Sequence, residues 1–428
     1  MKNILTVFSV LASRSVATAL GFMLNVMIAR LYGAENTGYY YLFLSWRGLV
    51  SGLLGGGYSP YVTRNIAVLL TNKKKPSNIV SYTMQNVLLS AFLMLLLVWG
   101  GLSISLFSFF LGGVHNQEII FCTIIAGIFL SLVRIMAAAF KGLEKPRTSI
   151  FLEFNAIPFI VLTILFFGYI CLFAITLTEL LWLFCLASAL TLLIGIRLWN
   201  KSLEKNIYTN LKPFSYQSRM QLLNKSVLHF WLINILSIGT YHAPFFILTF
   251  LATAQDIGQF GVANRLVALA AIVLVALSNI YAAKFAKSHH NGDAEQLHQY
   301  LKQSQIYSIA VYFPFFMVFI IFPNQILLLF GDEFTNAAIY LWILAFGQLI
   351  NALTGLVGNM LNMMEDEKFV FQVTLVLFFL SYPAMLVFGL NYGVTSVAII
   401  YAGGKAIVNI LFYWRVRYLL KHRYSRMS

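Results

Sequence analysis

Apolar runs long enough to cross a lipid bilayer follow one another along almost the whole chain of 428 residues. A helix needs roughly 20 apolar residues to span the hydrocarbon core. Backbone polar groups cannot stay unpaired there, so a spanning chain forms either a bundle of helices or a closed barrel. The runs lack the strict alternation of barrel strands, which predicts an all-α helix bundle. Charged residues make up only 10% of the chain, and this excludes a soluble protein.

Twelve membrane spans are predicted, joined mostly by short links that contain Gly, Asn, Asp or Pro. They cover residues 7–30, 39–59, 82–105, 118–140, 150–172, 177–197, 226–250, 261–283, 304–327, 337–362, 369–390 and 394–414. The longest polar stretch, 199–225, follows the sixth span and predicts a cytoplasmic linker between two six-helix lobes, 1–198 and 226–414. A basic tail, 415–428, follows the last span.

The basic residues predict the orientation of the chain. All but six of the 29 lysines and arginines lie at the termini or in links that follow even-numbered spans. The positive-inside rule therefore places both termini in the cytoplasm. Topology and contact with anionic lipid also account for much of the net charge of +15, so no nucleic-acid partner is expected. The other six are Arg14, Arg30, Arg47, Arg134, Arg265 and Lys405.

Cations inside spans are the strongest functional signal in the sequence. A cation at the bilayer centre costs roughly 2.5–3.5 kcal/mol on insertion scales, so such residues normally line a water-filled cavity. Arg47 and Lys405 lie nearest the middle of their spans, and Arg265 lies in the outer third. Arg134 can extend to the cytoplasmic interface and Arg30 lies at the outer boundary, so for these two both a cavity and an interfacial position stay open.

Few acids are available to neutralise these cations. Glu153 and Glu179 both lie near the ends of their spans. Unpaired cations in a cavity of low dielectric constant attract anions strongly, and arginine matches a phosphate with two parallel hydrogen bonds. The sequence therefore predicts a phosphate or pyrophosphate site formed by Arg14, Arg47, Arg265 and Lys405.

Polar stripes on several spans extend this predicted cavity. Residues 3, 4, 7 or 11 apart share one face of a helix. The longest stripe, in the tenth span, comprises Gln348, Asn351, Gly355, Asn359 and Asn362. Hydrogen bonds between neighbouring helices are the alternative role for such residues. The candidates for lining the cavity and solvating a sugar are Asn25, Asn234, Gln348, Asn351 and Tyr401. Spans 3, 5 and 9 are uniformly apolar and are predicted to face lipid.

The sequence gives no sign of an enzyme. Gly404-Lys405 lacks the earlier glycine and the following Ser or Thr of a nucleotide-binding loop, so ATP hydrolysis is not expected. No His/Glu metal motif occurs, and neither a cofactor nor a metal is predicted. No outer link is large enough to hold the active site of a polymerase or ligase.

A weak internal repeat relates the two predicted lobes. Residues 34–38 (Ala-Glu-Asn-Thr-Gly) lead into the second span, and residues 254–258 (Ala-Gln-Asp-Ile-Gly) lead into the eighth. An arginine follows each, Arg47 in one case and Arg265 in the other. Since six spans separate the copies, the halves would share one orientation, with cargo bound between them.

Several longer runs resemble a known family. They are Ile28–Gly38, Lys141–Pro146, Asp256–Arg265, Leu328–Phe334 and Asn359–Met363. In order and spacing they are similar to the polysaccharide transporters of the multidrug/oligosaccharidyl-lipid/polysaccharide (MOP) exporter superfamily, and among them to the Wzx-type O-antigen flippases. The resemblance covers nearly the whole chain.

This resemblance implies a twelve-helix, two-lobed MATE-like carrier of a bacterial inner membrane that works by alternating access. The implied cargo is an oligosaccharide linked to undecaprenyl pyrophosphate, moved from the cytoplasmic to the periplasmic leaflet, with H⁺ or Na⁺ as the coupling ion. Membrane lipid is the implied surrounding partner, and association with a polysaccharide polymerase and chain-length regulator stays open. Arg265 and Arg47 match arginines of the related lipid II flippases. Leu24 and Asn25 stand where those relatives carry Arg and Asp, which weighs against lipid II as cargo.

Three other functions remain as alternatives. A multidrug exporter of the same superfamily would favour acids in the cavity, because drug cargos are usually cationic. A membrane-embedded glycan polymerase or ligase would need a large outer loop with catalytic residues. A channel or scaffold is disfavoured by the internal repeat and by the scattered cations inside the spans.

Overall fold

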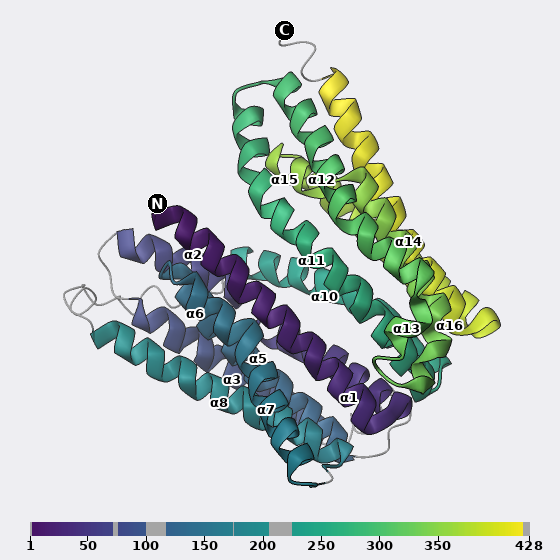
Figure 1. Cartoon of the computed structure of the whole chain (residues 1–428). Helices are drawn as coiled ribbons and strands as arrows, with labels where there is room; N and C mark the ends of the chain where they lie inside the picture. Colours follow the sequence, from purple (N-terminus) through teal and green to yellow (C-terminus); the bar gives the residue numbers. More distant parts are fainter. Residues whose placement is uncertain (1, 72–75, 100–116, 174, 205–224, 423–428) are drawn as a thin grey trace. The chain divides into compact units, whose positions relative to one another are not determined.

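The computed structural model describes residues 2–71, 76–99, 117–173, 175–204 and 225–422, and its regular elements there are all helices (Figure 1). The first are α1 (Lys2–Gly55), α2 (Tyr58–Thr71), α3 (Ser77–Trp99), α5 (Gln117–Gly142), α6 (Pro146–Ile150), the π-helical turn η1 (Phe151–Asn155), α7 (Ala156–Ile170) and α8 (Leu177–Glu204). Then follow α10 (Lys225–Leu251), α11 (Ala254–His290), α12 (Ala294–Ile321), α13 (Pro323–Leu327), the 3₁₀ turn η4 (Asp332–Ala337), α14 (Ala338–Thr354), α15 (Val357–Met363) and α16 (Glu367–His422). The predicted all-helical class is confirmed.

Parts of three predicted segments lie outside the described residues. They are 205–224 of the linker, 423–428 of the tail and the end of the third span, 100–105.

Nine helical stretches within the described ranges are long and apolar enough to cross a membrane. Two of the helices that contain them, α1 and α16, are interrupted by a glycine with non-helical backbone angles, Gly33 (φ 72°) and Gly393 (φ 66°). A positive φ costs glycine nothing, whereas a side chain at Cβ would be strained there. Both glycines lie where the sequence predicts a short link between two spans.

The helices form two compact units that exchange short segments of chain. Unit 1 comprises residues 1–27 and 40–242, and unit 2 comprises residues 28–39 and 243–428. The end of the first predicted span therefore belongs to unit 2, and the N-terminal part of α10 belongs to unit 1.

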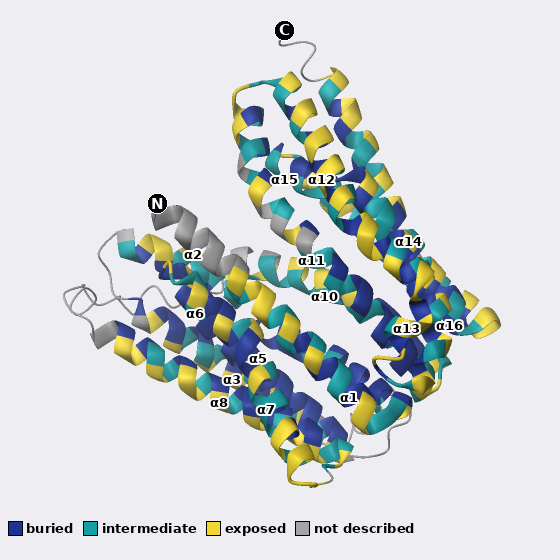
Figure 2. Ribbon diagram, viewed as in Figure 1, coloured by how far each residue is buried: buried dark blue, intermediate teal, exposed yellow. Residues whose placement is uncertain are grey.

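Helix α5 is the most buried candidate span of unit 1. In its most apolar window 78% of the residues are buried, against 28% for α3. Figure 2 shows this as a run of buried residues along α5. Its only inward-facing cation, Arg134, is therefore surrounded by protein, and its surroundings must be polar to hold the charge.

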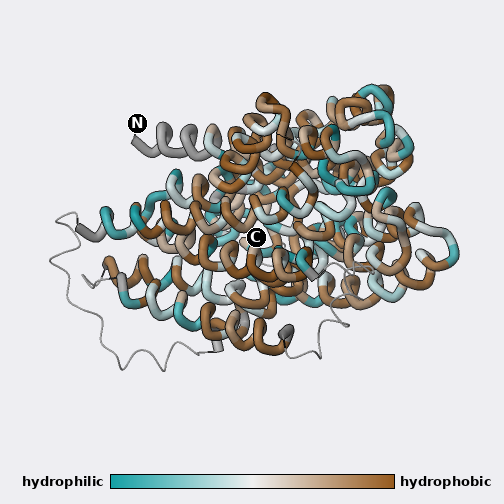
Figure 3. Tube along the Cα trace, turned by 90° about the horizontal axis from the view of Figure 1, so that it is seen from below, coloured by the Kyte–Doolittle hydropathy of each residue, from teal (hydrophilic) through white to brown (hydrophobic). Residues whose placement is uncertain are grey.

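Large apolar side chains are exposed on the outer faces of the helices, and Figure 3 shows most turns as hydrophobic. The spans predicted to face lipid follow this pattern. Exposed residues include Leu89, Phe92 and Leu97 on α3; Phe159, Phe166 and Phe167 on α7; and Ile306, Phe313 and Ile321 on α12. In water this surface would be unfavourable, whereas lipid chains cover it at no cost.

The two copies of the repeated pentapeptide meet inside unit 2, and their contact is reciprocal. A Cβ added to Gly38 would overlap the carbonyl oxygen of Ala254, and one added to Gly258 would overlap the carbonyl oxygen of Ala34. Each glycine thus lies against the alanine four residues before the other. Only a residue without a side chain lets two helix backbones approach this closely.

Polar contacts also hold the 28–39 segment within unit 2. The Glu333 carboxylate accepts a hydrogen bond of 2.7 Å from the backbone N–H of Ala34, next to the break at Gly33. Gln259 donates to the carbonyl oxygen of Glu333 at 2.8 Å. Arg30 donates to the carbonyls of Leu329 (2.7 Å) and Leu328 (3.2 Å), just past the end of α13. Arg30 therefore stabilises the carbonyl end of a short helix.

We expect Glu333→Ala to lower the stability of the protein in detergent. The substitution leaves the N–H of Ala34 without its acceptor, which costs about 1–3 kcal/mol for a buried group. Thermal unfolding followed by tryptophan fluorescence measures the loss. The control is Glu35→Ala, which removes an exposed carboxylate from the same segment. Equal melting temperatures for the two variants would contradict the assigned role of Glu333.

Candidate functional site

Unit 1 contains a polar cavity of about 510 Å³ whose lining includes two cations and one carboxylate. Arg134 and Lys141 reach it from α5, and Glu153 reaches it from η1. Uncharged polar residues complete the lining: Ser59 and Thr63 from α2, Ser149 from α6, and Asn234 and Ser237 from α10.

Arg134 occupies the deeper part of this cavity. It precedes Lys141 by seven residues, about 10 Å along the helix. Its Nη1 donates a hydrogen bond of 3.1 Å to the hydroxyl of Ser51 on α1. Arg134 therefore lines a cavity, which resolves the two positions that the sequence left open for it.

Asn234 lies in the same cavity against a stretch of glycines on α1. A Cβ added to Gly56 would overlap the Asn234 side-chain nitrogen, and one added to Gly52 would come within 3.2 Å of it. The Nδ2 group of Asn234 is buried and has no hydrogen-bond partner among the described residues. It is a donor available to a ligand.

Arg47 lies on α1 between aromatic rings. Its guanidinium carbon is 5.6 Å from the ring centre of Phe43 and 5.2 Å from that of Phe184 on α8. Both rings offer a cation–π interaction, which partly replaces hydration. Nε and Nη1 are buried without a hydrogen-bond partner in the described part of the chain. Arg47 thus keeps hydrogen-bond donors for an anion, although it does not line the cavity of about 510 Å³.

The two candidates from the first span have different surroundings. Arg14 is exposed, with its guanidinium carbon 5.2 Å from the ring centre of Phe154. Asn25 is buried, and its side-chain oxygen accepts a hydrogen bond of 2.9 Å from the hydroxyl of Tyr41. Its side-chain nitrogen donates to the carbonyl of Gly21, so its bonds are made within α1. Neither residue lines the cavity of unit 1.

Unit 2 has a polar cavity of its own, of about 410 Å³. Three of the predicted residues line it: Gln348 and Asn351 from α14, and Lys405 from α16. The other polar residues of the lining are Ser278, Asn359 and Asn409. The stripe predicted on the tenth span therefore faces a cavity over most of its length.

Tyr401 and Lys405 form a pair one turn apart on α16. The lysine Nζ donates to the Tyr401 hydroxyl at 2.6 Å and lies 3.9 Å from the centre of the same ring. Tyr401 is buried and is not part of the cavity wall, so its predicted role near a sugar becomes one of holding the ammonium group.

Arg265 is half-buried on α11, and its Nε is buried without a hydrogen-bond partner among the described residues. It lies six residues before Ala271, the first residue of α11 in the wall of the unit 2 cavity. Of the nine predicted site residues, Asn234 lines one cavity and Gln348, Asn351 and Lys405 line the other.

Sequence reasoning missed Arg134, Lys141 and Glu153 as members of one site. Arg134 was noticed as a cation within a span, and Glu153 as one of two acids near span ends. Their separation along the chain, on two helices joined by a turn, gave no signal that both face the same space.

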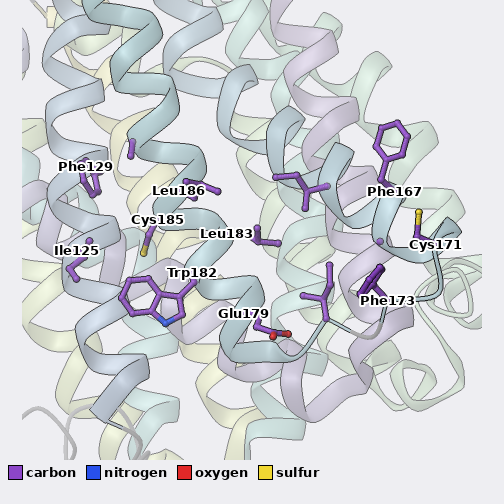
Figure 4. Close-up of a pocket in the computed structure, with 14 residues that line it drawn as sticks. Ile125, Phe129, Phe167, Cys171, Phe173, Glu179, Trp182, Leu183, Cys185 and Leu186 are labelled. Atoms are coloured by element: carbon purple, nitrogen blue, oxygen red, sulfur yellow. The ribbon is translucent and has the colours of Figure 1, made fainter.

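A larger pocket of about 970 Å³ lies between α5, α7 and α8 and is almost wholly apolar (Figure 4). Trp182, Leu186 and Phe129 lie on one side of it, and Phe167 and Phe173 lie on the other. Glu179 is its one charged lining residue, and its carboxylate is bonded to Thr176 at the start of α8. This pocket therefore suits apolar chains rather than an anion.

Comparisons with known proteins agree with this architecture. The MatE family model matches residues 232–387. Over 231 residues the chain is 22% identical to the probable low-salt glycan biosynthesis flippase Agl15 of Haloferax volcanii, and the match spans 52% of this chain and 48%, about half, of that protein.

Two solved structures share the fold over almost the whole chain. An inward-facing multidrug resistance MATE family transporter of the MOP superfamily superposes with a TM-score of 0.71 at 14% identity, covering 98% of this chain and 99% of that one. The lipid II flippase MurJ, in an inward closed conformation, gives 0.74 at 15% identity, covering 95% and 86%. The chain is therefore a multi-pass helical membrane protein with the fold shared by MATE transporters and MurJ, and it contains a MatE region.

Proposed function

We propose that the protein is a flippase that moves an anionic, lipid-linked oligosaccharide across a membrane by alternating access. The observation that carries this proposal is the state of Arg47 and Arg265. Both present buried guanidinium nitrogens without a hydrogen-bond partner, and neither forms an ion pair within the described residues. Cations held in this way in a membrane protein favour an anionic ligand such as a pyrophosphate headgroup.

The cargo class draws on the relatives. Agl15 is named as a glycan biosynthesis flippase and MurJ as a lipid II flippase. For this chain we propose undecaprenyl-pyrophosphate-linked repeat units of O-antigen or a related surface polysaccharide, in a bacterial inner membrane. Arg14, Arg47, Arg265 and Lys405 would bind the pyrophosphate. Asn234, Gln348 and Asn351 would solvate sugars, because each lines a polar cavity.

The proposed topology has twelve crossings with both termini in the cytoplasm. Breaks at Gly33 and Gly393 divide α1 and α16 into two spans each. The basic links after even-numbered spans then all lie on the cytoplasmic side.

Deletion of the gene provides the test of this function. We expect the deletion strain to accumulate lipid-linked oligosaccharide in the cytoplasmic leaflet, because synthesis continues while transfer stops. Mass spectrometry of extracted lipids, with a periplasmic glycan-modification assay, measures the amount and the leaflet. Restoration by the wild-type gene is the control. Normal surface polysaccharide in the deletion strain would refute the assignment.

A further inference from the structure

The cavity of unit 1 places one carboxylate among cations without direct pairing. Glu153, Arg134 and Lys141 all line it. The ion pair within 4.0 Å that the described residues form is Arg415–Asp366, in unit 2. Glu153 thus shares the space with Arg134 and Lys141 at longer range, and water or a ligand can lie between them.

The position of Glu153 in the helix is itself unusual. It occupies the π-helical turn η1, between α6 and α7. Such widened turns are rare and occur often at functional sites. Here the turn presents a carboxylate to the cavity from a helix that is otherwise apolar.

The charged groups around Glu153 are all cationic. Arg134 and Lys141 face it from α5, and Arg14 of α1 also interacts with it electrostatically. The elements α2, α6 and α10 contribute only uncharged polar groups to the cavity wall. The buried, unpartnered amide nitrogen of Asn234 adds a donor with no acceptor of its own.

We infer that this cavity is a proton-linked anion site, in which Arg134, Lys141 and Asn234 hold a phosphate-class group and Glu153 takes up a proton when the anion binds. An ionised Glu153 is the internal counter-ion of the empty cavity, and it repels an incoming anion. Protonation removes the repulsion and leaves the two cations to the ligand. The inference deepens the proposed function and rests on it for the class of ligand.

Calorimetric titration of the full-length protein in nanodiscs tests the inference. Inorganic pyrophosphate and geranyl pyrophosphate are the two probes, each titrated in buffers of different ionisation enthalpy. The proton count of the wild type minus that of Glu153→Gln cancels the titration of the probe itself. We expect about one more proton taken up by the wild type between pH 7 and 8. At pH 8 Glu153→Gln should bind about tenfold more tightly, which a unit charge roughly 10 Å away produces at an effective dielectric constant of about 20.

The cation variants locate the site. Arg134→Gln and Lys141→Gln should each weaken binding at least about tenfold, since a charge-assisted hydrogen bond is lost. Lys141 is exposed at its helix end, so its variant remains informative if Arg134→Gln does not fold. Glu367→Gln, an exposed carboxylate at the start of α16, is the control and should match the wild type.

The outcomes separate this inference from the proposed function. Tighter binding of geranyl pyrophosphate than of pyrophosphate identifies a lipid headgroup as ligand, and equal binding identifies the free anion; both support the site. Equal proton counts in wild type and Glu153→Gln, or unchanged binding in both cation variants, would overturn it even if the protein flips lipid. Proton-linked binding in a protein whose deletion leaves polysaccharide export normal would refute only the flippase.

Discussion

Replacing Arg47 and Arg265 together by alanine should abolish transport while the protein still inserts and folds. Each guanidinium would otherwise form charge-assisted hydrogen bonds to the headgroup, worth about 1.5–3 kcal/mol per residue. Losing both contacts costs roughly 3–6 kcal/mol, which corresponds to a loss of affinity on the order of 10²–10⁴-fold. Complementation of the deletion strain, quantified as surface polysaccharide, measures the effect.

Stability should move little in this double variant. Neither arginine donates a hydrogen bond from the nitrogens that are buried without partners, so their removal leaves no other group unsatisfied. The matched control is Arg197→Ala with Arg417→Ala, which removes one exposed cation from each unit. That variant should complement fully. Full complementation by the Arg47/Arg265 variant would remove the physical basis of the proposed anion site.

Gly38→Ala and Gly258→Ala should each destabilise the protein strongly. An added methyl group at either position meets a backbone carbonyl oxygen, which cannot rotate away as a side chain can. Overpacking of this kind costs about 1–3 kcal/mol, and the two substitutions should couple because the contact is shared. Thermal unfolding in detergent measures each variant and the pair.

A third glycine of α16 serves as the control. A Cβ added to Gly403 has no neighbour within 4 Å. Gly403→Ala should therefore be neutral or stabilising by up to about 1 kcal/mol, since alanine favours a helix. If Gly38→Ala behaved like Gly403→Ala, the close approach of the repeated segments would not exist in the folded protein.

The sequence predicted some parts of the site better than others. Gln348, Asn351 and Lys405 were found because their stripes repeat at the helical period, and a helix with one polar face must turn that face to a cavity or a neighbour. Asn25 belongs to a similar stripe, yet its amide group bonds to Tyr41 and Gly21. Periodicity identifies a polar face without telling which partner that face meets.

The limits of the units also escaped prediction. Hydropathy predicted a division near residues 199–225, where polarity is highest. In the structure the segment 28–39 belongs to unit 2 because glycine contacts and the Glu333 bond hold it against α11 and η4. Such contacts join residues more than 200 positions apart, and no local pattern encodes them.

The amino-acid sequence alone determined the class of this protein, its apolar outer faces and the presence of cations within its spans, because the length, hydropathy and period of a helix are local properties. Only the tertiary structure decided that Arg134, Lys141 and Glu153 share one cavity, that Tyr401 supports Lys405, and that the repeated pentapeptides pack against each other. These depend on which helix faces meet, and that choice is made by packing across the whole chain.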